Sequence, residues 1–429
     1  MIRYWDLESK AKMVVEAIPH VKSAAIGLFV GVGSRHEKPH LAGASHFIEH
    51  MLFKGTESRS AREIAESFES MGGQLNAFTS KEYTCLYART LDEDIYKAME
   101  IVFDMLFNSS FTGKDFATEK DVVSEEINMY EDAPDELIHD VFMSQLWRGN
   151  SMGSPILGTL DSVAGFDRDE IYSFYRYSYQ PSNLVIAIAG NVDPERIREK
   201  VDAYLASRSR DEVAFRMERP QPYVPFMQMV DKETEQVQLC LGVAGLSYHD
   251  ESRFTLNVLN SILGGGISSR LFQSIREEQG LAYAVYSAPS NYSDTGSFAV
   301  FVGTGPHKVG RFFEELHKEL ERFLKEGVSG EEIVRTQHLI KSSMYLGLES
   351  VINRMTRLGK SVLMYGKVID LEESIERIFA VRQDMVLDLA KKMLAEQELS
   401  MAAIGSAEVL PSVEQEFSRW WRPPGRTAI

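Results

Sequence analysis

Residues 46–50 read HFIEH, which places two histidines and a glutamate in the pattern H-x-x-E-H. On an α-helix the first, fourth and fifth of these positions lie on one face, so the side chains of His46, Glu49 and His50 point the same way. Two neutral imidazoles at this spacing suit a divalent metal such as Zn²⁺. A neighbouring carboxylate that does not bind the metal can take a proton from metal-bound water, whose pKa falls to about 7. The pattern therefore predicts either a hydrolytic metal site or, more simply, the polar face of a helix.

The neighbours of the pattern favour the metal site. Five apolar residues lie between or directly after the polar ones, namely Phe47, Ile48, Met51, Leu52 and Phe53. The helix is therefore expected to be buried. Two histidines and a glutamate on a buried face are costly unless they pair with one another or bind a metal.

A catalytic zinc usually has three protein ligands and one open position, so a third ligand is expected. The stretch DFATEKDVVSEEINMYEDAPDE offers candidates on one predicted helix. Glu119 and Glu126 are seven positions apart (126 − 119) and share a face, whereas Glu125 points elsewhere. One of the pair could bind the metal and the other could orient a ligating histidine. From spacing alone, a solvated acidic helix is the favoured explanation of these residues.

The elements around this region alternate between strands and helices, which predicts an α+β fold. At 429 residues and 48.5 kDa the chain is long enough for two or three domains. Residues 213–226 are rich in charge and proline and are predicted to be a linker. The expected organisation is a first domain at 1–212, which carries the metal site, and a second at 227–429.

The two halves show signs of an internal duplication. A shift of 211 positions places GLFVGVG (27–33) on QLCLGVA (238–244) and HFIEHMLFKGTESR (46–59) on NVLNSILGGGISSR (257–270). His46, Glu49 and His50 then fall on Asn257, Asn260 and Ser261. The second half is thus expected to repeat the fold without the metal ligands.

Composition excludes several classes of function. The net charge of −17 and a pI near 5.2 argue against a nucleic-acid or anionic-membrane partner. No window approaches ~18 consecutive apolar residues, so no membrane span is expected. The start of the chain lacks the apolar stretch of a secretory signal, and Cys85 and Cys240 are expected to be buried thiols. A cytoplasmic location is predicted.

Taken together, the motifs resemble those of the pitrilysin/insulinase zinc peptidases. HFIEHMLFKGT is followed, 76 positions after His50 (126 − 50), by Glu126 in EKDVVSEEI. GGQLNAFTSKEYTCLYA resembles a strand segment that lines the family's cleft, and LGGGISSRLFQSIREEQGLAYAVYS resembles its glycine-rich loop and Arg/Tyr region. The branch it is most similar to is that of the mitochondrial processing peptidase β-subunit and its bacterial relatives.

The resemblance implies a role for each matching residue. His46, His50 and Glu126 would be the ligands of one Zn²⁺ per chain, Glu49 the general base and Glu119 the carboxylate that orients a ligand. Arg276 and Tyr283 would bind the substrate backbone and stabilise the oxyanion. The substrate-binding positions would be a strand and a loop: Asn76, Ala77, Phe78, Gly264, Gly265 and Gly266.

The function implied is that of a metalloendopeptidase that cleaves peptides or unstructured polypeptide segments inside a closed chamber. Two homologous domains, each with helices packed on a mostly antiparallel sheet, would form the chain, and a homodimer would complete the chamber. Two other functions are consistent with part of these observations. One is a structural subunit of the same fold without activity, and the other is a metal-dependent lyase, like the enzyme that cleaves S-ribosylhomocysteine, which also carries H-x-x-E-H.

Overall fold

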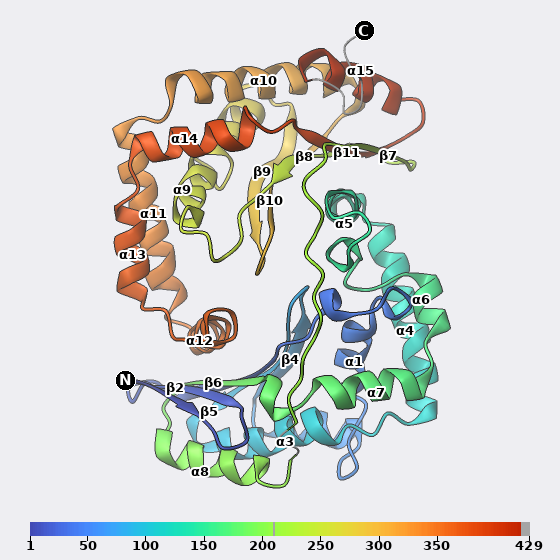
Figure 1. Ribbon diagram of the computed structural model, residues 1–429, viewed down its shortest axis with the longest axis vertical. Coiled ribbons are helices and arrows are strands. Elements are labelled where there is room, and N and C mark those ends of the chain that lie inside the picture. Colours follow the sequence, from blue (N-terminus) through green and yellow to red (C-terminus); the bar gives the residue numbers. More distant parts are fainter. Residues whose placement is uncertain (209–210, 422–429) are drawn as a thin grey trace. The chain divides into compact units, whose positions relative to one another are not determined.

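The computed structural model describes residues 1–208 and 211–421. The chain forms two compact units, each assembled from separate segments (Figure 1). Unit 1 contains residues 1–128, 154–217 and 344–370, and unit 2 contains residues 129–153, 218–343 and 371–429. Each unit is built on one β-sheet with helices packed against its faces.

Unit 1 has a six-stranded sheet in the order β1-β2-β6-β3-β5-β4. Its strands are β1 (Ile2–Asp6), β2 (Lys12–Ala17), β3 (Ser23–Val30), β4 (Gln74–Thr79), β5 (Thr84–Leu91) and β6 (Leu184–Gly190). Its helices are α1 (Ala44–Leu52), α2 (Ala61–Ser70), α3 (Ile95–Asn108), most of α4 (Gly113–Glu131), α6 (Leu160–Gly165), α7 (Arg168–Ser178), α8 (Pro194–Leu205) and α12 (Val351–Tyr365).

Along the central strand β3, apolar side chains point alternately to the two faces of the sheet, which explains why helices cover both faces. Ile26 and Leu28 point into the core that contains α1 and α3, while Ala25 and Phe29 point into a second core against α12. Because successive side chains of a strand point to opposite faces, a strand that is apolar throughout requires cover on both sides. α1 packs against β4 and β5, which brings the HFIEH helix to the β4 side of the sheet.

Unit 2 has a five-stranded sheet in the order β7-β11-β8-β10-β9. Its strands are β7 (Met227–Asp231), β8 (Val237–Ala244), β9 (Ala282–Asn291), β10 (Gly296–Thr304) and β11 (Ser400–Gly405). Its helices are α5 (Pro134–Leu146), α9 (Arg253–Leu263), a π-helical segment (Phe272–Glu278), α10 (Val309–Glu326), most of α11 (Gly330–Gly347), α13 (Leu371–Phe379), α14 (Gln383–Leu394) and α15 (Leu410–Trp420).

The two sheets repeat one topology, which confirms the predicted duplication. In unit 1, β2 is parallel to β6, and the pairs β6–β3, β3–β5 and β5–β4 are antiparallel. In unit 2, β7 is parallel to β11, and the pairs β11–β8, β8–β10 and β10–β9 are antiparallel. Strand β1 is an addition to the first sheet. The α+β class with two homologous, mostly antiparallel halves is therefore correct.

Each sheet is covered in part by one helix that lies, in the sequence, on the opposite side of residues 213–226 from most of that sheet's unit. Helix α5 precedes that stretch but packs on β8, β11 and β7, and α12 follows it but packs on β3, β6 and β2. In Figure 1, α12 is orange while the strands it covers are blue and green, which shows its distance in sequence. Residues 213–226 contain no helix or strand. Their role as a linker between halves at 1–212 and 227–429 stays a prediction.

Candidate metal centre

Helix α1 presents the three residues of the motif to one side. Its apolar side chains Phe47, Ile48 and Met51 are fully buried in the core of unit 1. This burial fixes the rotation of the helix, so His46, Glu49 and His50 must share the remaining face.

The second element of the site is α4, which brings Glu126 to the two histidines. One ligand atom from each of His46, His50 and Glu126 lies within 4.8 Å of the others. The Oε2 atom of Glu126 is 3.7 Å from Nε2 of His46 and 3.3 Å from Nε2 of His50. Ligand atoms around a tetrahedral Zn²⁺ with bonds of about 2.0–2.1 Å lie about 3.3 Å apart, so this donor set fits the ion.

Burial and neighbouring charges set the protonation of the two imidazoles. His46 is 7% exposed, and this burial lowers its pKa, which leaves the ring neutral as a metal ligand must be. Burial also acts to lower the pKa of His50, but its contacts with Glu119 and Glu126 outweigh that and raise the pKa to about 9 in the metal-free protein. A cation bound at His50 therefore displaces a proton.

Glu119 holds His50 in one orientation. It is 1% exposed, and its Oε1 accepts a hydrogen bond of 2.8 Å from Nδ1 of His50. Its Oε2 lies 2.6 Å from Nζ of Lys54. Burial acts to raise the pKa of Glu119, but these two partners hold it below its usual range. Because Nδ1 keeps its hydrogen in the bond to Glu119, Nε2 of His50 is the nitrogen that can give up its proton and bind a metal.

We expect Glu119→Gln to raise the zinc dissociation constant about 10–100-fold, as does loss of other outer carboxylates that support a histidine ligand. His50 bonds one carboxylate oxygen of Glu119 and Lys54 forms an ion pair with the other, whereas the single amide oxygen of a glutamine can face only one of these partners while its NH₂ group faces the other. Competition with a zinc chelator measures the change. Glu125→Gln, on the exposed side of α4, is the matched control, and equal affinities of the two variants would contradict the role given to Glu119.

Glu49 occupies the position expected of a general base. It lies between the two histidines on α1, and its Oε2 accepts a hydrogen bond of 2.5 Å from the hydroxyl of Thr79 at the end of β4. Burial raises the pKa of Glu49, although the bond from Thr79 and the nearby His50 oppose this. A carboxyl group with a raised pKa is suited to exchanging a proton near neutral pH.

Sequence reasoning did not identify Thr79. It directly follows the three residues predicted to bind substrate, Asn76, Ala77 and Phe78, all of which lie in β4. Within the described residues β4 pairs only with β5, so its other edge is available for an added strand. The Ala77 N–H bonds the side chain of Asn76. The signal that was missed is a hydroxyl residue at the last position of a strand that packs on α1.

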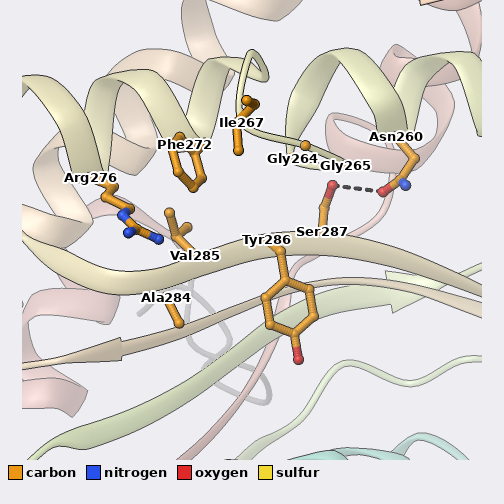
Figure 2. Close-up of a pocket in the computed structure, with 11 residues that line it drawn as sticks. Asn260, Gly264, Gly265, Ile267, Phe272, Arg276, Ala284, Val285, Tyr286 and Ser287 are labelled. Atoms are coloured by element: carbon orange, nitrogen blue, oxygen red, sulfur yellow. Dashed lines mark hydrogen bonds between the residues drawn. The ribbon is translucent and has the colours of Figure 1, made fainter. Parts of the chain in front are cut away.

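Unit 2 brings the remaining predicted residues together. Arg276 lies in the π-helical segment, and its guanidinium carbon is 4.7 Å from the ring centres of both Phe272 and Tyr283. The ring of Tyr283, in β9, is exposed. Figure 2 shows the adjoining cavity of about 400 Å³, lined by Asn260, Gly264, Gly265, Gly266, Ile267, Phe272, Arg276, Ala284, Val285, Tyr286 and Ser287. The guanidinium of Arg276 and the exposed phenol of Tyr283 are therefore neighbours within unit 2.

Because the fold is duplicated, the second half contains a position equivalent to that of Glu49. The registers of the two sheets give matching chains of paired residues: Val30–Thr84–Thr79 in the first half, and Leu241–Val300–Ser287 in the second. Thr79 therefore corresponds to Ser287, and Glu49 to Asn260. The Asn260 Oδ1 accepts a hydrogen bond of 2.7 Å from the Ser287 hydroxyl, drawn in Figure 2. The second half keeps this link between helix and edge strand but has a neutral amide where the first half has a carboxylate.

The fold and the site together define a class of protein: a duplicated α+β chain in which, among the described residues, only the first half brings two histidines of the inverted motif together with a glutamate from another helix. Residues 12–160 match the family described as "Insulinase (Peptidase family M16)", and residues 165–340 match "Peptidase M16 inactive domain". The chain belongs to this insulinase, or M16, peptidase family.

Relatives of similar length support this assignment. The uncharacterized zinc protease YmxG of Bacillus subtilis is 42% identical over 412 residues, which cover 96% of this chain and 100% of that one. The uncharacterized zinc protease SCO5738 of Streptomyces coelicolor is 39% identical over 94% of this chain and 89% of its own length. A solved structure of a protease from Helicobacter pylori has the same fold, with a TM-score of 0.89 at 19% identity over 94% of this chain and 99% of that chain.

No helix among the described residues combines the length and the apolar character needed to cross a membrane.

Proposed function

We propose that this protein is a zinc-dependent endopeptidase that hydrolyses peptides or unstructured polypeptide segments. The observation that carries the proposal is the convergence of His46, His50 and Glu126, at separations that fit tetrahedral zinc, beside the partly buried carboxyl group of Glu49. The zinc proteases among the relatives support the choice of metal and of reaction.

His46, His50 and Glu126 would hold one Zn²⁺ per chain, which supplies Lewis-acid chemistry and a water of lowered pKa. Glu49 then takes a proton from the attacking water at its carboxylate and passes it to the nitrogen of the leaving amine. The hydroxyl of Thr79 keeps the carboxylate of Glu49 in place during both transfers. Glu119 keeps His50 in the tautomer that leaves Nε2 for the metal.

The substrate is proposed to bind as an extended strand along the free edge of β4, at Asn76, Ala77 and Phe78. This mode uses main-chain hydrogen bonds and accepts many sequences, but it requires an unfolded segment. Arg276 and Tyr283 are proposed to donate to the oxyanion that forms on the scissile carbonyl, and the loop Gly264–Gly266 to contact the substrate.

The proposal includes a homodimer in the cytoplasm that encloses a chamber, which the family resemblance implies. Such a chamber would admit peptides and exclude folded proteins.

Removal of the metal is expected to abolish hydrolysis reversibly. Zinc content per chain is measured on the purified protein, and cleavage of a library of unstructured peptides is followed before chelation, after chelation and after zinc is restored. The proposal predicts one zinc per chain and activity that returns with zinc. A protein that holds zinc and cleaves no peptide would favour the lyase alternative, and one that binds no zinc and cleaves nothing would favour the structural-subunit alternative.

A further inference from the structure

Helix α1 begins without a side-chain cap of its own. Its N-cap residue is Gly43, which has a left-handed backbone with φ of 93°. A side chain there would also collide with the neighbouring segment, since an added Cβ would lie 2.6 Å from the carbonyl oxygen of Leu157 and 2.9 Å from Cα of Gly158. The first amide groups of a helix need acceptors, and the usual Ser, Thr, Asp or Asn cap is excluded at this position.

Glu37 supplies the missing cap from outside the helix. Its Oε2 accepts a hydrogen bond of 2.8 Å from the N–H of Gly43, and its Oε1 accepts one of 2.6 Å from the N–H of Ser45. Both carboxylate oxygens are thus committed to the first turn of α1. A carboxylate at this end of a helix is also favoured by the helix dipole.

The contact between Glu37 and α1 lies next to the predicted metal ligands. His46 is the third residue of α1 and directly follows Ser45, so the turn that Glu37 holds is the turn that carries the first predicted zinc ligand. Glu37 is buried at 7% exposure, and that burial raises its pKa to about 7, against the bonds from Ser45 and Gly43 and the charge of Lys81. Packing on all sides leaves the carboxyl group little freedom to move.

We propose that Glu37 is a positioning residue of the metal centre, which fixes the first turn of α1 so that His46 meets His50 and Glu126 in the geometry that zinc requires. This inference rests on the proposed function, because it takes His46 to be a zinc ligand. Glu37 touches neither the metal nor the substrate and acts through the backbone of α1.

The neighbouring helix α2 provides a matched control. Its N-cap Ser60 accepts from the N–H of Glu63 in an ordinary capping box, and none of the predicted site residues lies on α2. Ser60→Ala removes a helix cap from the same unit at a cost of typically about 1 kcal/mol. It therefore separates a general loss of stability from a specific effect on the metal centre.

The test compares zinc affinity in the full-length protein for wild type, Glu37→Gln and Ser60→Ala, by competition with a chelator at a temperature where all three are folded. A glutamine keeps the shape of the side chain but can accept from only one of the two amides and turns its NH₂ group toward the other. We expect Glu37→Gln to raise the zinc dissociation constant about tenfold, the lower end of the effect of removing a direct support of a ligand. Ser60→Ala should leave it unchanged.

Amide hydrogen exchange of metal-free protein gives a second readout that is independent of activity. Glu37→Gln should speed exchange at Gly43–Phe47, and Ser60→Ala should speed it only at the start of α2. If Glu37→Gln does not fold, Glu37→Asp, which keeps the charge and shortens the side chain, takes its place with the same expectations.

Three outcomes would decide the matter. A Glu37 variant with the zinc affinity of wild type overturns the inference, as does a Ser60→Ala variant that loses affinity to the same extent. A wild-type protein that binds no zinc overturns the proposed function itself and is thereby distinguished from the first two results.

Discussion

The Glu49→Gln variant is expected to keep its zinc and to lose about 10²–10⁴-fold in kcat for peptide hydrolysis, the range by which a positioned acid–base group accelerates a reaction. Glutamine preserves the hydrogen bond from the Thr79 hydroxyl, because the amide oxygen still accepts. It removes only the ability to take and return a proton. KM should change little, since Glu49 binds the reacting water and not the substrate backbone.

The measurement pairs zinc content per chain with steady-state kinetics on an unstructured peptide. Glu125→Gln is the control, because it makes the same chemical change on the exposed face of α4 beside the ligand Glu126. If the Glu49 variant holds zinc and retains activity within about tenfold of wild type, Glu49 is not the general base. If it loses zinc together with activity, the result concerns the assembly of the site and is resolved by measuring kcat after zinc is added back.

Much of the site could be predicted because helical periodicity is a local property. The positions of His46, Glu49 and His50 follow from the pitch of one helix, and the common face of Glu119 and Glu126 follows from two turns of another. The spacing could not show that α1 and α4 meet. The resemblance to a family suggested that pairing, and the structure brings Glu126 to within 3.7 Å of both histidines.

The supporting residues lay beyond sequence reasoning for a physical reason. Thr79 reaches Glu49 from a strand 30 positions away, and Glu37 reaches α1 from the turn before it. Neither contact leaves a periodic trace, because each depends on how one element packs on another. A glycine at the start of a helix was a readable sign that its cap must come from elsewhere.

Sequence reasoning also could not predict which sheet α5 and α12 cover. The duplication was predictable from a few identities at a shift of 211 positions, and the strand order confirms it. An apolar helix face shows only that the helix covers something. Nothing in the sequences of α5 and α12 states which of two similar sheets each one covers, and that choice depends on packing across the whole fold.

The packing of α12 on its sheet leads to the second large effect, a loss of stability in Gly359→Ala. In the interior of an exposed helix this change would stabilise the protein by up to about 1 kcal/mol. Here an added Cβ would lie 2.1, 2.4 and 2.6 Å from three ring carbons of Phe29, which is fully buried in β3. Relief of that contact requires α12 to move from the sheet or the ring to leave its rotamer, at about 1–3 kcal/mol or more.

The steric cost therefore exceeds the gain in helix propensity, and the midpoint of thermal unfolding should fall. Gly347→Ala is the control, because an added Cβ at that position, at the end of α11, would meet no described atom within 4 Å apart from its chain neighbours and the backbone of its own helix. The control should unfold at or slightly above the wild-type temperature. A Gly359→Ala protein that unfolds no lower than the control would mean that α12 does not approach β3 as closely as the glycine indicates. The close approach matters beyond stability, because β3 pairs with β5 and β5 with β4, the strand whose last residue holds Glu49.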